Sequence, residues 1–302
     1  MKNAFTLQGG NLLAYVTAFF VVTVWGTTFV QTKVLINAGL LPEEIFLYRF
    51  VLAYLLIMPL AGKRLFLDNW RDELLAMLLG ITGGSLYFVT ENTALVYGYC
   101  SNVSLLVCVT PLTTALAMRW LHTDDKPGRG VLIGSCVALM GVALVVFNGN
   151  FVLKLSPLAD GLAFAACICW TLYSVVMQYV QPRYPTMLIM RKVFGYGVLT
   201  ILPFFISEAP HVELLFGGGF KVWFNVLMLG CVASMLCYTL WNFVLKRLGT
   251  VRATNFIYLN PVVTMLCSWA VLDEHITWMA MLGAVLVLLG MFMAEKKRNI
   301  SK

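Results

Sequence analysis

Apolar runs long enough to cross a lipid bilayer recur along almost the whole chain. The hydrocarbon core of a bilayer is about 30 Å thick, and an α-helix crosses it with about 20 residues. Ten mostly apolar segments have roughly this length: 11–34, 43–61, 73–96, 101–121, 130–148, 157–180, 186–207, 220–245, 252–272 and 276–294. Backbone groups in lipid must bond within their own helix. We therefore expect an all-α integral membrane protein with ten transmembrane helices.

Lys and Arg near the segment ends predict how the helices are oriented, because translocating these residues is disfavoured. With a cytoplasmic N-terminus, seventeen basic residues fall inside and only Lys33, Lys154 and Lys221 fall outside, with Arg49 set aside as buried in its helix. We expect a multi-pass protein of the cytoplasmic membrane with both termini in the cytoplasm. This topology accounts for the net charge of +7, so the charge gives no reason to expect nucleic acid as a partner.

The second half of the chain repeats the first at a shift of 150 residues. Around two segments the match needs no gap and includes Gly80/Gly230, Asn92/Asn242 and Pro111/Pro261. Each copy, 1–150 and 151–302, holds five segments, an odd number, so the copies should cross the membrane in opposite directions. The uncharged loop "YGYCSN" and its counterpart "KRLGTVR" agree with this. Inverted five-helix repeats are typical of secondary transporters, which bind solute between their halves.

Several motifs accompany the repeat: "WGTTFV" in the first segment, prolines within "TPLTTALAMRWL" and "NPVVTMLCSWAVLDEHITW", and the Gly-spaced "LGAVLVLLG". Together they resemble the drug/metabolite transporter superfamily, as two EamA-type domains in tandem. The resemblance implies a ten-helix carrier, often an exporter of amino acids, other small metabolites or drugs. Glu274 matches the family's acidic residue before the last helix, and Asp124 with Asp125 form a shortened version. Because carboxylates there cap the next helix, we interpret Asp125 and Glu274 as structural.

Polar and aromatic side chains gather in six of the ten segments. As candidates for a solute pathway we select Trp25, Thr28, Arg49, Tyr87, Glu91, Asn92, Trp170, Tyr173, Tyr238, Trp241, Asn242, Asn255 and Tyr258. Trp25 and Trp170 hold equivalent positions in the two halves, and cavity lining and core packing are equally open for them. Pro111 and Pro261 each remove a backbone donor, so both are expected at helix kinks, either rigid or bending with a gate.

Glu91 and Arg49 are the charged residues placed deepest among these candidates. Glu91 lies about six residues, or roughly 9 Å, below the outer end of its segment, and Arg49 lies at a similar depth. Intramembrane charges usually pair or face water, so we predict that the two side chains meet. The pair is either a static brace, an outer latch, or a carboxylate that exchanges between Arg49 and a proton or a cationic group of the solute.

Segments five and ten are apolar but carry small residues at close-packing spacing: Gly130, Gly134, Ala138, Gly141, Gly283 and Gly290. Such faces let helix backbones approach closely. These helices are therefore interpreted as a scaffold or as the contact of a homodimer.

The sequence shows no recognisable catalytic or metal-binding motif. Its eight cysteines fall in or beside apolar segments, without His or acidic residues at ligand spacing, so we expect buried thiols, no metal and no cofactor. We predict a non-enzymatic secondary transporter or facilitator that moves a small organic solute by alternating access, in the export direction, with a proton or another ion as candidate coupling species. The competing interpretation is a membrane-embedded enzyme without a recognisable motif. A channel is disfavoured because no ring of pore-lining charges or filter repeat is visible.

Overall fold

The computed structural model describes residues 9–98, 100–121, 128–147, 156–206, 209–272 and 277–296, and within these ranges it contains helices and no strand. The helices of the first half are α1 (Gly9–Asn37), α2 (Pro42–Ile57), η1 (Met58–Leu60), α3 (Trp70–Gly80), η2 (Ile81–Ser85), α4 (Leu86–Tyr97), α5 (Cys100–Val107), α6 (Thr110–Trp120) and α7 (Arg129–Phe147). Those of the second half are α8 (Pro157–Val180), α9 (Thr186–Ile201), η3 (Leu202–Phe205), α10 (Val212–Gly217), α11 (Gly219–Leu227), η4 (Met228–Leu236), α12 (Cys237–Leu248), α13 (Thr250–Asn255), η5 (Phe256–Leu259), α14 (Asn260–Leu272) and α15 (Trp278–Lys296).

Five helical stretches are long and apolar enough to cross a membrane: Leu12–Asn37, Trp70–Tyr97, Pro157–Val180, Thr186–Phe205 and Gly219–Leu248. Two shorter apolar helices cover Gly130–Val145 and Trp278–Ala294. Large apolar side chains face outward along these helices, and Leu282 on α15, for example, is 62% exposed. A surface of this kind is favourable against lipid and unfavourable against water. The helical architecture therefore agrees with a membrane protein.

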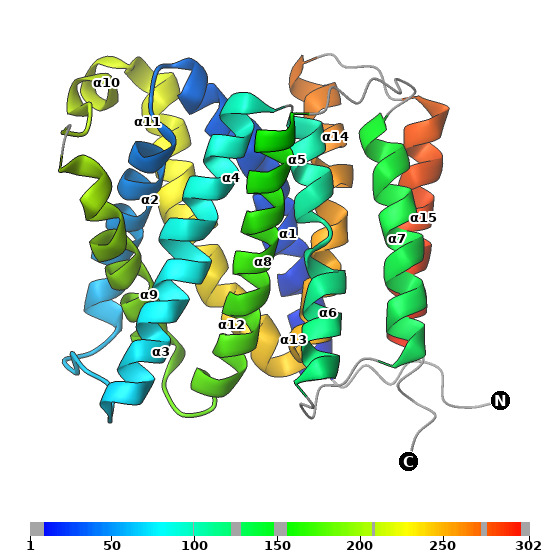
Figure 1. Cartoon of the computed structure of the whole chain (residues 1–302), viewed down its shortest axis with the longest axis horizontal. Helices are drawn as coiled ribbons and strands as arrows, with labels where there is room; N and C mark the ends of the chain where they lie inside the picture. The colour runs from blue at the N-terminus through cyan, green and yellow to red at the C-terminus, as the bar shows by residue number, and fades with distance from the viewer. Residues whose placement is uncertain are drawn as a thin grey trace.

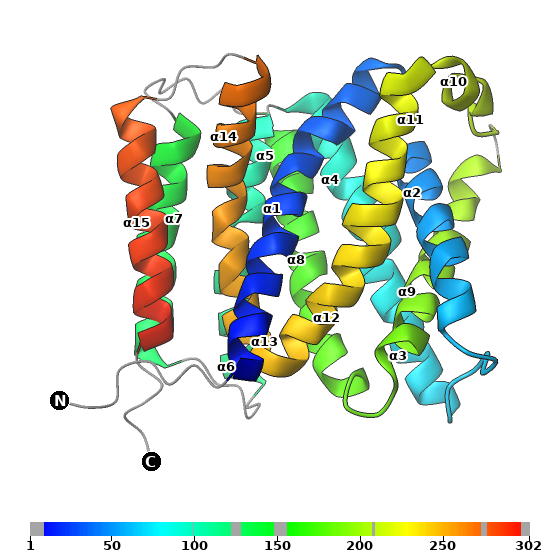
Figure 2. The same cartoon turned by 180° about the vertical axis from the view of Figure 1, so that it is seen from behind.

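The helices run between two ends of the bundle (Figure 1). We call the end at which α3 begins and α8 and α12 end the lower end, and the end at which α2 and α8 begin the upper end. Helix α1 lies close to α12 and α14, with α4 packed against α8. Helices α7 and α15 form a pair at one side of the bundle, as the front and back views both show (Figures 1 and 2).

Glycines let α7 and α15 pack backbone to backbone. A Cβ atom added to Gly141 of α7 would lie 2.5 Å from the backbone nitrogen of Val287, and one added to Gly134 would lie 2.5 Å from that of Ala294. Gly283 of α15 faces the backbone of α7 in the same way. The small-residue faces of the fifth and tenth segments therefore contact each other within one chain, in agreement with the scaffold interpretation.

Two long helices are interrupted by a wide, π-helical turn at positions that match at the 150-residue shift. The first turn is η2, between α3 and α4, and the second is η4, between α11 and α12. Within η2 the backbone of Gly84 leaves the helical region, with φ −132° and ψ −108°. Such turns widen the helix and leave carbonyl groups free to accept bonds from elsewhere.

The two repeated prolines follow breaks in the helix. Pro111 is the second residue of α6, which begins after the break that ends α5, and Pro261 is the second residue of α14, which begins after the 3-10 turn η5. Val109 before α6 (φ −72°, ψ −17°) and Asn260 after η5 (φ −51°, ψ −50°) both keep right-handed helical backbone angles, so each proline follows a local irregularity of the helix at the place where a kink was expected. Proline is well tolerated at this place because the first turn of a helix has no internal partner for its N–H groups.

Candidate functional site

A cavity lies in the middle of the bundle between the two halves of the chain. The empty space within it is about 460 Å³, with any part open to solvent included. Side chains from both halves line it: Trp25, Thr28, Phe29, Arg49, Tyr87, Phe88, Glu91, Val107, Thr110, Trp170, Tyr238, Ile257 and Asn260. The wall is thus largely aromatic, with one carboxylate and one guanidinium group.

The two wide helical turns hold aromatic side chains of this wall in place. The Tyr238 hydroxyl donates to the Gly83 carbonyl in η2 at 2.7 Å, and the Trp25 Nε1–H donates to the Ala233 carbonyl in η4 at 3.0 Å. Residues 83 and 233 are equivalent at the 150-residue shift, and each accepts from the opposite half. The irregular turns therefore join the halves of the chain at the cavity wall.

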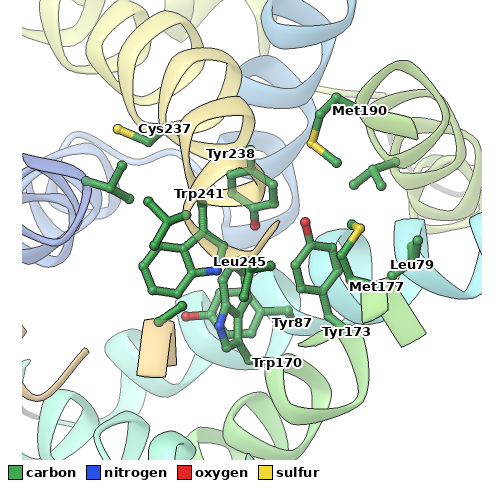
Figure 3. Close-up of a cluster of buried hydrophobic side chains, with 14 of the residues drawn as sticks. Leu79, Tyr87, Trp170, Tyr173, Met177, Met190, Cys237, Tyr238, Trp241 and Leu245 are labelled. Carbon is green, nitrogen blue, oxygen red and sulfur yellow. The ribbon is translucent and has the colours of Figure 1, made fainter. Parts of the chain in front are cut away.

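Figure 3 shows a cluster of buried aromatic rings, of which Tyr87, Trp170 and Tyr238 also line the cavity. The Trp25 and Trp170 rings meet edge to face, with 5.3 Å between centroids and an interplanar angle of 88°. Tyr87 and Tyr238 pack against Trp170 at 5.2 Å and 5.6 Å. Edge-to-face contacts of this kind are favourable between aromatic rings. Trp25 and Trp170 therefore combine the two expected alternatives, since both line the cavity and both pack against neighbouring rings.

The predicted direct contact between Arg49 and Glu91 is wrong. Both residues line the cavity, but the ion pairs of the described residues do not include them. Arg49 Nε instead donates to Ser234 Oγ at 2.9 Å, and its guanidinium carbon lies 4.0 Å from the Phe88 ring centroid. Glu91 Oε1 accepts from the Tyr87 hydroxyl at 2.7 Å. Each charged group is therefore held by neutral partners that are nearer than the opposite charge.

Seven of the thirteen candidate pathway residues line the cavity: Trp25, Thr28, Arg49, Tyr87, Glu91, Trp170 and Tyr238. The sequence-based selection did not include Phe29, Phe88, Val107, Thr110, Ile257 and Asn260. The repeat itself contains a signal for two of these, since Thr110 and Asn260 directly precede the repeated prolines. The cavity therefore extends to both broken helices.

The other six candidates lie in the core around the cavity. Tyr173 and Trp241 are fully buried and pack on Trp170 and Trp25, respectively. The Asn242 amide donates to the Tyr238 carbonyl at 2.9 Å.

The remaining three candidates are Asn92, Asn255 and Tyr258. Asn92 Nδ2 donates to the Pro42 carbonyl at the start of α2, at 3.0 Å, and so braces two helices. Asn255 and Tyr258 are buried in α13 and η5.

Polar contacts join the two halves at the lower end of the bundle. Asp72, at the start of α3, accepts from Tyr184 at 2.6 Å and from Arg183 at 2.8 Å. The neighbouring Glu73 accepts from Lys192 and Tyr196 of α9. These contacts hold the first turn of α3 against the α8–α9 connection and α9.

Asp124, Asp125 and Glu274 lie outside the described residues. The cysteines whose side chains are described are free thiols, and the described residues contain no group of three or more His, Cys, Asp or Glu side chains that could hold a metal ion.

Comparison with known proteins relates the chain to transporters over nearly its whole length. The model of the EamA-like transporter family matches residues 12–147 and again residues 157–295. An uncharacterized transporter of Bacillus subtilis, YyaM, is 31% identical over 231 residues, which cover 74% of this chain and 73% of that protein. A probable amino-acid metabolite efflux pump of Escherichia coli is 25% identical over 288 residues, or 92% and 93% of the two chains.

A solved crystal structure has the same fold, with a TM-score of 0.76 and 17% identity over 93% of this chain and 97% of that one. The two family matches, together with apolar helices arranged around a central cavity, confirm the resemblance that the motifs indicated. The chain is a multi-pass membrane protein that belongs to the EamA-like transporter family.

Proposed function

We propose that the protein is a secondary transporter that exports a small organic solute across the cytoplasmic membrane by alternating access. The observation that carries this proposal is the central cavity, because both halves of the chain line it and it contains both a carboxylate and a guanidinium group. A solute bound there would contact both halves. Relative movement of the halves would then change the side from which the solute is reached.

The polar atoms of the cavity favour a solute with both a cationic and an anionic group. Arg49 uses Nε on Ser234, and among the described residues its two Nη atoms have no hydrogen-bond partner. Glu91 uses Oε1 on Tyr87, and its Oε2 is similarly unpartnered within the described structure. Guanidinium groups bind carboxylates well, and a carboxylate binds ammonium groups. An amino acid or a derivative with an apolar side chain fits this arrangement.

Alternating access follows from the inverted repeat that we propose for residues 1–150 and 151–302, with five membrane-spanning helices in each half. The equivalent turns η2 and η4 and the equivalent cavity residues Thr110 and Asn260 support this symmetry. If the halves exchange conformations, a state open to one side becomes a state of similar energy that is open to the other.

The distribution of basic residues supports a cytoplasmic lower end, with both termini in the cytoplasm. The lower end carries Lys63, Arg64, Arg71, Arg119, Arg129, Arg183, Lys246, Arg247 and Arg252, whereas Lys33 and Lys221 lie toward the upper end. A reporter fused after Gly249 should therefore report cytoplasm, and one fused after Gly98 should report the outside. Reporters that find both positions on one side would contradict the inverted repeat.

A proton is the coupling ion that we propose, with Glu91 as the group that carries it. Glu91 is 7% exposed and lines the cavity, so it can exchange a proton or a cationic solute group there. A homodimer through α7 and α15 would have to use their outward apolar faces, because their glycine faces already pack against each other.

Flux measurements with purified protein in liposomes would test the function. A panel of radiolabelled amino acids and cationic drugs, with and without a pH gradient, should reveal a solute whose flux depends on the protein. For that solute, Glu91→Gln should lower the flux at least tenfold, whereas the matched control Glu213→Gln, at an exposed position, should not change it. Protein that is folded but moves no solute on the panel would count against the substrate class. Equal flux in both variants would remove Glu91 from the site.

A further inference from the structure

One side of α8 carries three polar atoms that are buried and have no hydrogen-bond partner among the described residues. They are Trp170 Nε1, Ser174 Oγ and Gln178 Oε1. A spacing of four residues places them about 6 Å apart along one side of the helix. Trp170 lines the cavity, and Gln178 lies near the lower end of α8 (Figure 1). The three side chains, here called the α8 stripe, therefore lead from the cavity toward the lower end of the bundle.

Hydrogen bonds on both flanks show which neighbours the α8 stripe faces. On one flank, Gln181 Nε2 donates to the Asn242 carbonyl of α12 at 2.5 Å. On the other flank, the hydroxyls of Thr171 and of Thr113 in α6 share a hydrogen bond of 2.6 Å. By helical geometry Ser174 projects between these two directions. The stripe therefore lies along the seam between α12 on one side and α6 on the other.

The helices beside this seam also contain buried polar atoms without a partner. Trp241 Nε1 in α12 belongs to a side chain with no exposed surface, and Asn255 Oδ1 lies in α13, which contacts both α12 and α8. Most buried polar atoms in native proteins are hydrogen-bonded, and an unpartnered one lowers stability. Five such atoms beside one seam therefore indicate a place that can offer polar partners to water or to a solute.

We infer that this seam is the lower half of the solute pathway, closed in this structure, and that it opens when α8 separates from α12. The inference rests on the proposed transport function and adds the route by which the solute reaches the cavity from the lower end. In the open conformation the stripe offers the indole N–H, the hydroxyl and the amide carbonyl to the ammonium, carboxylate or hydration shell of a passing solute. The Gln181 hydrogen bond to α12 is one of the contacts that keep the seam closed, together with the hydrogen bond from Asn242 Nδ2 to the Tyr173 hydroxyl at 3.3 Å and the packing of Tyr238 on Trp170.

Cysteine labelling would test this route. The single variants Ser174→Cys and Gln178→Cys, which keep the natural cysteines, are each reconstituted in liposomes. A bulky, membrane-impermeant methanethiosulfonate is then added from one side at a time. Peptide mass spectrometry then gives the rate of adduct formation at the introduced position alone. The matched control is Val176→Cys, since Val176 lies between the two test positions, is buried, and projects from the opposite side of α8. Reaction at positions 174 and 178 should be at least tenfold faster than at 176, and only from the lower side.

A second variant tests the closing contact. Adding Gln181→Ala should speed labelling of Ser174→Cys by about two- to tenfold, the population shift expected from the loss of one hydrogen bond. Equal labelling at 174 and 176 would overturn the inference. Reaction with silver ions but not with the bulky reagent would also overturn it, because the seam would then pass only water-sized species. Solute flux is measured in the same liposomes. Flux without labelling would overturn the route alone, and labelling without flux of any solute would overturn both the route and the transport function.

Discussion

Removing a single oxygen atom from Tyr238 should destabilise the protein measurably. The Tyr238 hydroxyl donates to the Gly83 carbonyl at 2.7 Å, and the side chain is 1% exposed. In Tyr238→Phe the ring can stay in place, so no large cavity forms, but the carbonyl in the wide turn η2 loses its partner away from water. Leaving such a group unsatisfied costs about 1–3 kcal/mol.

The chain contains a matched control for this substitution. The Tyr48 hydroxyl is also buried but has no hydrogen-bond partner among the described residues. Tyr48→Phe removes the same atom without stranding an acceptor, so its effect should be close to zero or slightly stabilising. The difference between the two variants therefore isolates the contact between the halves at η2 from the general effect of changing Tyr to Phe.

Thermal unfolding of the purified protein in detergent, without solute, would measure the difference. A change of 1 kcal/mol shifts the midpoint by about 2–4 °C in chains of about 150–250 residues, and by somewhat less in longer ones. Tyr238→Phe should therefore melt several degrees below the wild type, while Tyr48→Phe should melt within about 1 °C of it. Equal shifts for the two variants, or a larger loss for Tyr48→Phe, would refute the argument that the Gly83 carbonyl in η2 needs its donor from the opposite half.

Three further predictions concern other parts of the fold. Gly141→Leu should force α7 and α15 apart and lower the melting temperature by several degrees, because overpacking costs about 1–3 kcal/mol, whereas Gly161→Ala, where a new Cβ would have no neighbour within 4 Å, should be neutral or stabilising. Arg183→Ala should cost at most about 1 kcal/mol because its side chain is 57% exposed, but Asp72→Asn should cost more in the same melting assay, since that carboxylate is buried and accepts several bonds. A reversed order in either pair would contradict the packing or the lower-end contacts described above. Flux through Glu91→Gln liposomes should lose its dependence on an imposed pH gradient; a retained dependence would assign proton coupling to another group.

The membrane character of the chain follows from its sequence because bilayer thickness is a fixed requirement. An apolar run of about 20 residues satisfies it whatever its neighbours are, so the long apolar helices could be located without tertiary information. The family motifs also depend on local residue order. The glycines of the fifth and tenth segments are a similar case, since small residues at this spacing permit close approach of backbones, and the structure uses them between α7 and α15.

The cavity was only partly predictable, because its lining depends on how helices rotate and break. The sequence predicts Glu91 and Arg49 at a similar depth in the membrane, and both side chains line the cavity. Depth does not specify partners, however. Arg49 bonds to Ser234, which is 185 residues away along the chain, and Glu91 bonds to Tyr87, one turn earlier on its own helix.

The wide turns η2 and η4 explain much of this difference between sequence and structure. Their carbonyls at Gly83 and Ala233 accept from Tyr238 and Trp25 of the opposite half, and no local pattern of residues indicates that these particular groups will meet. A π-turn rotates every residue beyond it relative to a regular helix, so the faces assigned by regular periodicity shift. The amino-acid sequence by itself thus determined that the chain would be apolar helices of a transporter family, and only the tertiary structure decided which polar groups share the cavity, because a hydrogen bond depends on positions in space that several helices set together.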